Sequence, residues 1–137
     1  MNRADLQRVA RLRVQEAHTL LMGGRFPGAY YLMGYAVECA LKACVAKQAR
    51  RYDFPDKKLA NDVYTHDLKK LLRVAELTRV FEADRRANPA LALNWAIVKD
   101  WSEEARYEAG ITGSQARDLY LACTGRNGVL PWVRKRW

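Results

Sequence analysis

The chain has 137 residues, 50% of them hydrophobic, and a net charge of +9 from 24 Lys and Arg against 15 Asp and Glu. This length suits one domain over residues 1–137, with a core that needs neither metal nor disulfide. No apolar run reaches about 18 residues, so the sequence predicts no membrane span. The basic charge favours an acidic partner (nucleic acid, a nucleotide or an acidic protein), although a solvated Arg-rich surface gives the same balance.

The cysteines indicate the redox environment. Cys39, Cys44 and Cys123 are odd in number and match no zinc or redox motif, so we expect free thiols and a cytoplasmic location. The charged start, MNRADLQRVAR, does not have the apolar run of a signal peptide. With two histidines and no clustered acids, the sequence favours neither a metal nor another cofactor.

A first helix is predicted from about Asn2 to Met22, and the glycines at 23–24 end it. Only about four residues join it to the next helix, so the two should be antiparallel neighbours. Arg13 projects near the middle of the apolar side of this first helix. An Arg in that position needs a partner, and we expect it to meet Glu38.

The second helix contains the stretch Ala29–Val45, AYYLMGYAVECALKACV, and should end near Arg51. Its apolar side chains fall at almost every angle of a helical wheel, which is typical of a helix buried on most sides. One strip departs from this pattern, because four polar residues repeat at i, i+4, i+7 and i+11: Tyr31, Tyr35, Glu38 and Lys42. The sequence therefore predicts a central helix with one polar strip in an apolar setting.

A polar connection is expected over 52–64, before a third helix that Thr65 or Asp67 caps. A fourth helical region covers 78–107 and is interrupted before Pro89. In its second part, 89–107, the core-facing set should be Leu93, Ile97 and Trp101.

Thr112 and Gln115 form a capping-box pattern for a last helix that ends at about Thr124. In the tail PWVRKRW, Trp132 and Val133 could pack on the bundle, and Trp137 beside its basic neighbours could stack on a base. Together these elements predict an all-α fold, an up-and-down bundle of four to five antiparallel helices with a short C-terminal tail helix.

Three segments resemble the HEPN (higher eukaryotes and prokaryotes nucleotide-binding) domain family: GAYYLMGYAVECALKA at 28–43, THDLKKLL at 65–72 and DWSEEARY at 100–107. The closing GVLPWVRKRW also resembles tails of this group. The resemblance implies a HEPN-like bundle, often a homodimer, with a link to nucleic-acid biology. Family members include ribonuclease toxins, partners of small nucleotidyltransferases in toxin–antitoxin pairs, and proteins of defence systems. A nucleotidyltransferase-type protein, a nucleotide or RNA is therefore the implied partner.

Ribonucleases of the family carry an Arg separated from a His by four to six residues, late in the bundle. Here Arg106 is followed by no His, and Arg13 and His18, which do fit the spacing, lie in the first helix. The resemblance therefore implies a non-catalytic binding module. The alternative is a metal-independent ribonuclease with a relocated site that uses Arg13, His18 or His66.

Six residues make up the predicted ligand site: Tyr31, Tyr35, Glu38, Lys42, His66 and Arg106. In this hypothesis Lys42 and Arg106 bind phosphate or ribose, and His66 is a general acid or base at a helix start. In the alternative, Glu38 and Lys42 form an ion-pair network with Arg13 that fixes the helix register, and His66 caps or packs against its helix.

Overall fold

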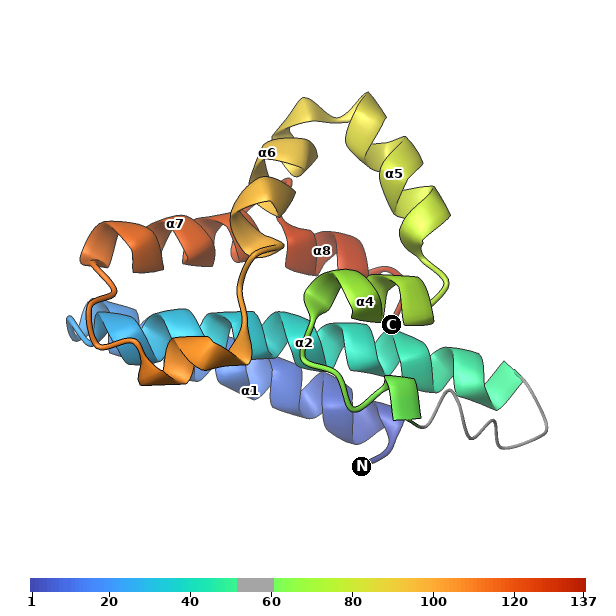
Figure 1. The fold of residues 1–137 in the computed structure, drawn as a ribbon, viewed down its shortest axis with the longest axis horizontal. Helices are drawn as coiled ribbons and strands as arrows, with labels where there is room; N and C mark the ends of the chain where they lie inside the picture. Colours follow the sequence, from blue (N-terminus) through green and yellow to red (C-terminus); the bar gives the residue numbers. More distant parts are fainter. Residues whose placement is uncertain (52–60) are drawn as a thin grey trace.

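The computed structural model of the chain describes residues 1–51 and 61–137, and within these ranges every regular element is a helix (Figure 1). The predicted all-α class is confirmed for this part of the chain. Most of the polar connection predicted at 52–64 lies outside the described residues. In order, the elements are α1 (Arg3–Met22), α2 (Phe26–Arg51), α4 (Leu68–Val74), α5 (Thr78–Ala87), α6 (Pro89–Val98), the 3₁₀ helix η1 (Glu103–Tyr107), α7 (Gly113–Thr124) and α8 (Val129–Arg134).

Helices α1 and α2 form the predicted antiparallel pair. Asn2 caps α1 in a capping box with Asp5, which satisfies amides that the first turn leaves unpaired. At the other end, Gly24 has a φ of +73°, a conformation that L side chains rarely adopt, and so permits the tight reversal into α2. The side-chain pattern and the glycine stop were therefore sufficient to locate this hairpin.

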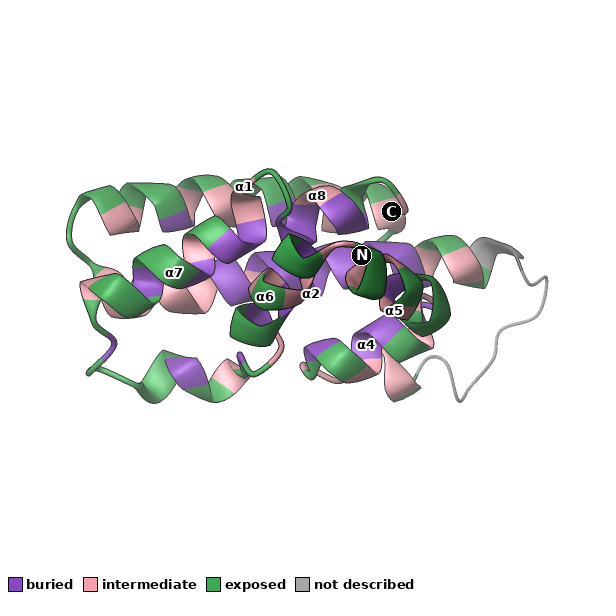
Figure 2. Cartoon of the chain, turned by 90° about the horizontal axis from the view of Figure 1, so that it is seen from above, coloured by how far each residue is buried: buried purple, intermediate pink, exposed green. Residues whose placement is uncertain are grey.

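Helix α2 lies at the centre of the molecule and packs against α1, α4, η1, α7 and α8. Met33, Val37 and Leu41 have no exposed surface, as predicted for a helix that is apolar nearly all round. Figure 2 shows the buried residues gathered along α2 and on the sides of its neighbours that face it. This arrangement places any polar group on α2 inside the protein.

Helices α7 and α8 run alongside α2 in the same direction. The start of α7 lies at the start of α2, because a Cβ on Gly113 would come within 2.9 Å of the Phe26 ring. Towards the other end of α2, the carbonyl of Val133 lies 3.9 Å from Cys44 Sγ. Between the two helices the turn requires glycine at 128, where a Cβ would lie 2.6 Å from the carbonyl oxygen of Cys123.

Several local predictions for this C-terminal part are confirmed. Thr112 and Gln115 form the capping box of α7, with both reciprocal hydrogen bonds present. The tail forms α8, in which Trp132 and Val133 are buried against the core. The indole N–H of Trp132 donates to Asp84 at 2.8 Å, so α8 is also tied to α5.

The prediction for 89–107 was partly wrong. The break before Pro89 and the burial of Trp101 are confirmed, but α6 ends at Val98, and the short η1 follows as a separate element. Leu93 and Ile97 are 70% and 44% exposed, not core-facing. The buried face of α6 consists instead of Leu91, Trp95 and Val98. Because α6 is apolar all round, periodicity alone could not select the side that faces the core.

None of the helices in the described ranges has both the length and the apolar character needed to cross a membrane.

Candidate functional site

Four ionisable side chains from three separate segments meet beside α2. Glu38 and Lys42 lie one turn apart on α2, His66 immediately precedes Asp67, the N-cap of α4, and Glu103 begins η1. Lys42 Nζ lies 3.1 Å from Glu38 Oε2, and His66 Nδ1 lies 2.8 Å from Glu38 Oε1. The second ring nitrogen of His66, Nε2, lies 3.0 Å from Glu103 Oε2. We call these four residues the Glu38 cluster.

Glu38 is the buried charge of this cluster, with 1% of its surface exposed. An ionised carboxylate in an apolar interior costs several kcal/mol unless it is paired and hydrogen-bonded. Here each oxygen has its own cationic or ring-nitrogen partner, from Lys42 and His66. The polar strip predicted on α2 is therefore buried at Glu38. The burial of this carboxylate depends on His66, which lies 28 positions away in the sequence.

The His66 ring is held between two carboxylates. An ionised carboxylate can only accept hydrogen bonds, whereas a neutral imidazole has a single N–H donor. The ring therefore satisfies both Glu38 and Glu103 only when both nitrogens carry a proton. In that form the cluster contains two positive and two negative groups, so its charges balance.

Three aromatic side chains stack next to the preceding turns of α2. The rings of Tyr31 and Trp101 stack at 6.1 Å, and the ring of Tyr35 lies 6.1 Å from that of Tyr31. Trp101 rests directly on α2 at Gly34, where a Cβ would lie 2.1 Å from the indole ring. Burial raises the pKa of the Tyr35 hydroxyl, with smaller contributions from nearby groups that include Glu38, so this hydroxyl stays neutral at physiological pH.

An open pocket of about 340 Å³ lies between the start of α4 and the segment 99–104, and His66 and Glu103 belong to its wall. Its other ionisable lining residues are three acids and two lysines: Asp67, Asp100, Glu104, Lys69 and Lys99. With Glu103, the wall therefore has four carboxylates and two ammonium groups. Carboxylates outnumber ammonium groups, so a phosphate here would meet more repulsion than attraction. The pocket suits a neutral or positively charged group better than an anion.

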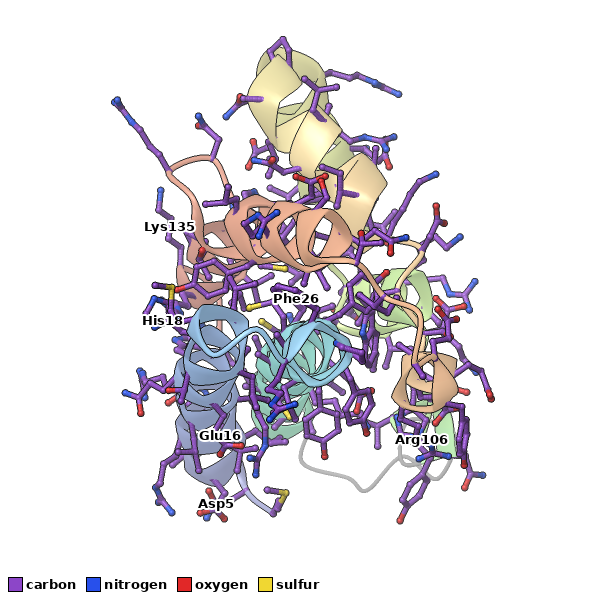
Figure 3. All side chains as sticks on the ribbon, turned by 90° about the vertical axis from the view of Figure 1, so that its left-hand side faces the viewer. Asp5, Glu16, His18, Phe26, Arg106 and Lys135 are labelled. Atoms are coloured by element: carbon purple, nitrogen blue, oxygen red, sulfur yellow. The ribbon has the colours of Figure 1, made fainter. Side chains whose placement is uncertain are left out.

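The structure brings together most of the predicted ligand site. Tyr31, Tyr35, Glu38 and Lys42 share one face of α2, and His66 joins them from the start of α4. Arg106 is exposed on η1, with its guanidinium 4.9 Å from the ring centroid of Tyr107, and Figure 3 shows it at the outer edge of the molecule. Lys42 is engaged by Glu38, so it is not a free phosphate ligand.

The predicted contact between Arg13 and Glu38 was wrong. Arg13 pairs with Glu16 on its own helix at 2.5 Å. The two oxygens of Glu38 already accept from Lys42 and His66, and an acid three residues along α1 is the nearer partner for Arg13.

The relocated ribonuclease pair is not assembled in the described residues. His18 is exposed on α1, with its ring 5.6 Å from that of Tyr120. Side chains five residues apart on a helix project about 140° apart, which separates His18 from Arg13. Figure 3 shows His18 on the outer side of α1.

Glu103 is the site residue that the sequence did not reveal. It lies 37 positions after His66, and the sequence offered it only as a possible ion-pair partner of Arg106 within the DWSEEARY segment. The local pattern does indicate a helix start, because Ser102 caps η1 and acids follow it in the first turn. Nothing in that pattern indicates which histidine the acid would meet.

Comparisons with family models, with curated proteins and with solved structures found no match to this chain.

Proposed function

We propose that this chain is a non-catalytic HEPN-like binding module, an up-and-down helical bundle that works as a cytoplasmic homodimer in a toxin–antitoxin or defence system. Its partner would be a nucleotidyltransferase-type protein, a nucleotide or RNA. One observation carries the proposal. Each of the three segments that resemble the family contributes a residue to one cluster: Glu38 from 28–43, His66 from 65–72 and Glu103 from 100–107.

The occupied ring of His66 supports a binding role. A general acid or base needs a ring nitrogen within hydrogen-bonding reach of the reacting group. Both nitrogens of His66 already face carboxylates, and Arg13 and His18 project in different directions from α1. A structural role therefore fits the Glu38 cluster better: its contacts hold η1 and the start of α4 against α2, and so shape the adjacent pocket.

Two measurements test this function. Size-exclusion chromatography with light scattering at micromolar concentration should give twice the mass of one chain. Incubation of the purified protein with RNA in EDTA should leave the RNA intact. A monomer would contradict the homodimer, and cleavage that depends on His18 or His66 would overturn the non-catalytic role.

A ribonuclease that uses His66 is the second candidate, and one observation favours it. His66 lies in the pocket wall, and the buried Glu38 holds its Nδ1, as an orienting carboxylate does for a catalytic histidine. Movement of Glu103 would release Nε2 towards the pocket. If this candidate is correct, His66→Ala abolishes cleavage in EDTA and Glu103→Gln keeps or raises it, whereas His18→Ala has no effect.

A further inference from the structure

A second cluster of charges gathers at Trp137, away from the Glu38 cluster. Arg11 and Arg134 lie over this ring, with guanidinium carbons 4.8 and 5.8 Å from its centroid. Arg3 donates through Nη2 to the main-chain oxygen of Trp137. Lys47 on α2 donates through Nζ to the carbonyl oxygen of Arg136, 3.3 Å away. We call Arg3, Arg11, Lys47, Arg134 and Trp137 the Trp137 cluster.

None of the four cations of this cluster pairs with an Asp or Glu side chain among the residues that the structure describes. Other cations do have one: Arg13 pairs with Glu16, Lys42 with Glu38, Arg85 with Glu82 and Arg136 with Asp84. The Trp137 cluster therefore brings four cationic side chains of α1, α2 and α8 together without an acidic side chain to pair with them. Burial lowers the pKa of Arg134, and repulsion from the nearby guanidinium of Arg11 lowers it further.

The ring of Trp137 explains how two like charges are held close together. A guanidinium over an indole face gains a cation–π attraction that offsets part of the repulsion. Both guanidinium groups lie against this ring, and their N–H groups remain available to a ligand. Arginine recognises phosphate through two parallel N–H···O bonds, so a pair of oriented guanidinium groups is well suited to successive phosphates.

We propose that the Trp137 cluster binds the phosphate backbone of single-stranded nucleic acid, with Arg11 and Arg134 as the principal contacts. The inference deepens the nucleic-acid part of the proposed function and rests on it for its biological role. It also places phosphate binding away from the pocket beside His66, where carboxylates outnumber lysines. Figure 3 shows Lys135, next to Arg134, and Arg106 of η1 on opposite sides of the molecule.

The composition of the cluster favours nucleic acid over an acidic protein. Protein–protein interfaces are also enriched in Arg and Trp, but charged residues as a whole are depleted at their centres, whereas nucleic-acid interfaces are much more positively charged. Surfaces for single strands combine cations with aromatic side chains and with arginine cation–π contacts. The Trp137 cluster has both features, since two guanidinium groups lie over its ring and two further cations contact main-chain oxygens of residues 136 and 137.

The test is fluorescence anisotropy with an end-labelled single-stranded 12-nucleotide RNA and the purified full chain, at several salt concentrations. About four phosphate contacts on a single strand predict a slope of log affinity against log salt near −3. The double variant Arg11→Gln/Arg134→Gln should lose tenfold or more in affinity, and the slope should become shallower by about 1.4. Arg11→Lys/Arg134→Lys keeps the charge but loses the guanidinium fork, so its affinity should lie in between.

The matched control is Arg79→Gln/Arg86→Gln, which removes the same charge from exposed positions on α5. It should change affinity less than twofold. Equal losses in the two Gln variants, tighter binding of a 12-base-pair duplex, or preferential binding of labelled polyglutamate would each overturn the proposal. Circular dichroism checks that each variant is folded. Dimer mass and RNA cleavage are measured separately, so failure of this inference is distinguishable from failure of the proposed function.

Discussion

Helices α2 and α6 are both apolar nearly all round in sequence, yet the protein covers them to different extents. Helix α2 packs against α1, α4, η1, α7 and α8, and its residue Leu41 is fully buried. Helix α6 packs against α5, α7 and α8 but leaves Leu93 and Ile97 on its outer face. An apolar pattern thus indicates that a helix gains from being covered, and the number of other elements around it decides how much cover it receives.

The two helices also differ in how they use polar groups. Helix α6 has no charged residue between Pro89 and Val98, so its exposure costs only hydration of apolar surface. Helix α2 buries Glu38, and the partners that make this possible include His66, from a distant segment. Substitutions should therefore be costly along α2 and nearly neutral on the outer face of α6.

The largest contrast is expected between two leucines. Leu41→Ala should lower the free energy of unfolding by about 4 kcal/mol, because it removes a fully buried side chain and leaves a cavity. Leu93→Ala, at a position 70% exposed, should change it by less than about 0.5 kcal/mol. Urea unfolding followed by circular dichroism measures both values. Similar losses for the two variants would mean that α6 is covered in solution.

The next effect concerns the buried carboxylate. Glu38→Gln should cost about 3 kcal/mol, because it leaves the mostly buried ammonium of Lys42 without a counter-charge. The matched control is Glu82→Gln on α5, which breaks a half-exposed pair with Arg85 and should cost less than about 1 kcal/mol. The same urea titration serves for both. Equal costs would show that water screens Glu38 as well as it screens Glu82.

A third comparison uses two glycines. Gly34→Ala should destabilise the protein by about 2 kcal/mol, because the new Cβ would overlap the Trp101 ring. Helix propensity alone predicts the opposite sign, a gain of about 1 kcal/mol. Gly110→Ala is the control, since a Cβ there meets no atom within 4 Å. A more stable Gly34→Ala variant would disprove the packing of Trp101 on α2.

What could be predicted from the sequence is what nearby residues decide. The glycine stop after α1, the capping box of α7 and the central position of α2 depend on local chemistry and on one helical period. The same is true of the Glu38–Lys42 pair, which is a single turn of helix.

The remaining features depend on how distant segments approach one another. The contact of Glu103 with His66 requires η1 to fold back onto α2, and no spacing rule describes that approach. The partner of Arg13 was misassigned because the sequence does not show that Glu38 pairs with Lys42 and His66, while Glu16 lies closer to Arg13. The HEPN-like assignment, the homodimer and the ligand residues remain predictions.

The prediction with the smallest effect on stability uses cysteine reactivity. The rate at which a thiol is labelled measures directly how well its helix is shielded from solvent. Burial raises the pKa of Cys39 and of Cys44, both on α2, to about 11. The thiolate is the reactive form, so both should react slowly with a disulfide reagent at pH 8. Leu93→Cys on α6 should react at the rate of a free thiol and should change stability by less than about 0.5 kcal/mol.

The pH dependence of this reaction follows from the direction of the pKa shift. Thiols of the unfolded chain ionise near pH 8.5, well below the folded value of about 11 for Cys39 and Cys44. Their contribution to stability is therefore complete below about pH 8.5 and is lost as the pH rises towards 11. Labelling of the native cysteines should accelerate as the pH rises from about 8.5 towards 11, whereas the thiol of Leu93→Cys should already react fast near pH 8.5. Equally fast labelling at pH 8 would mean that α2 is no better covered than the outer face of α6.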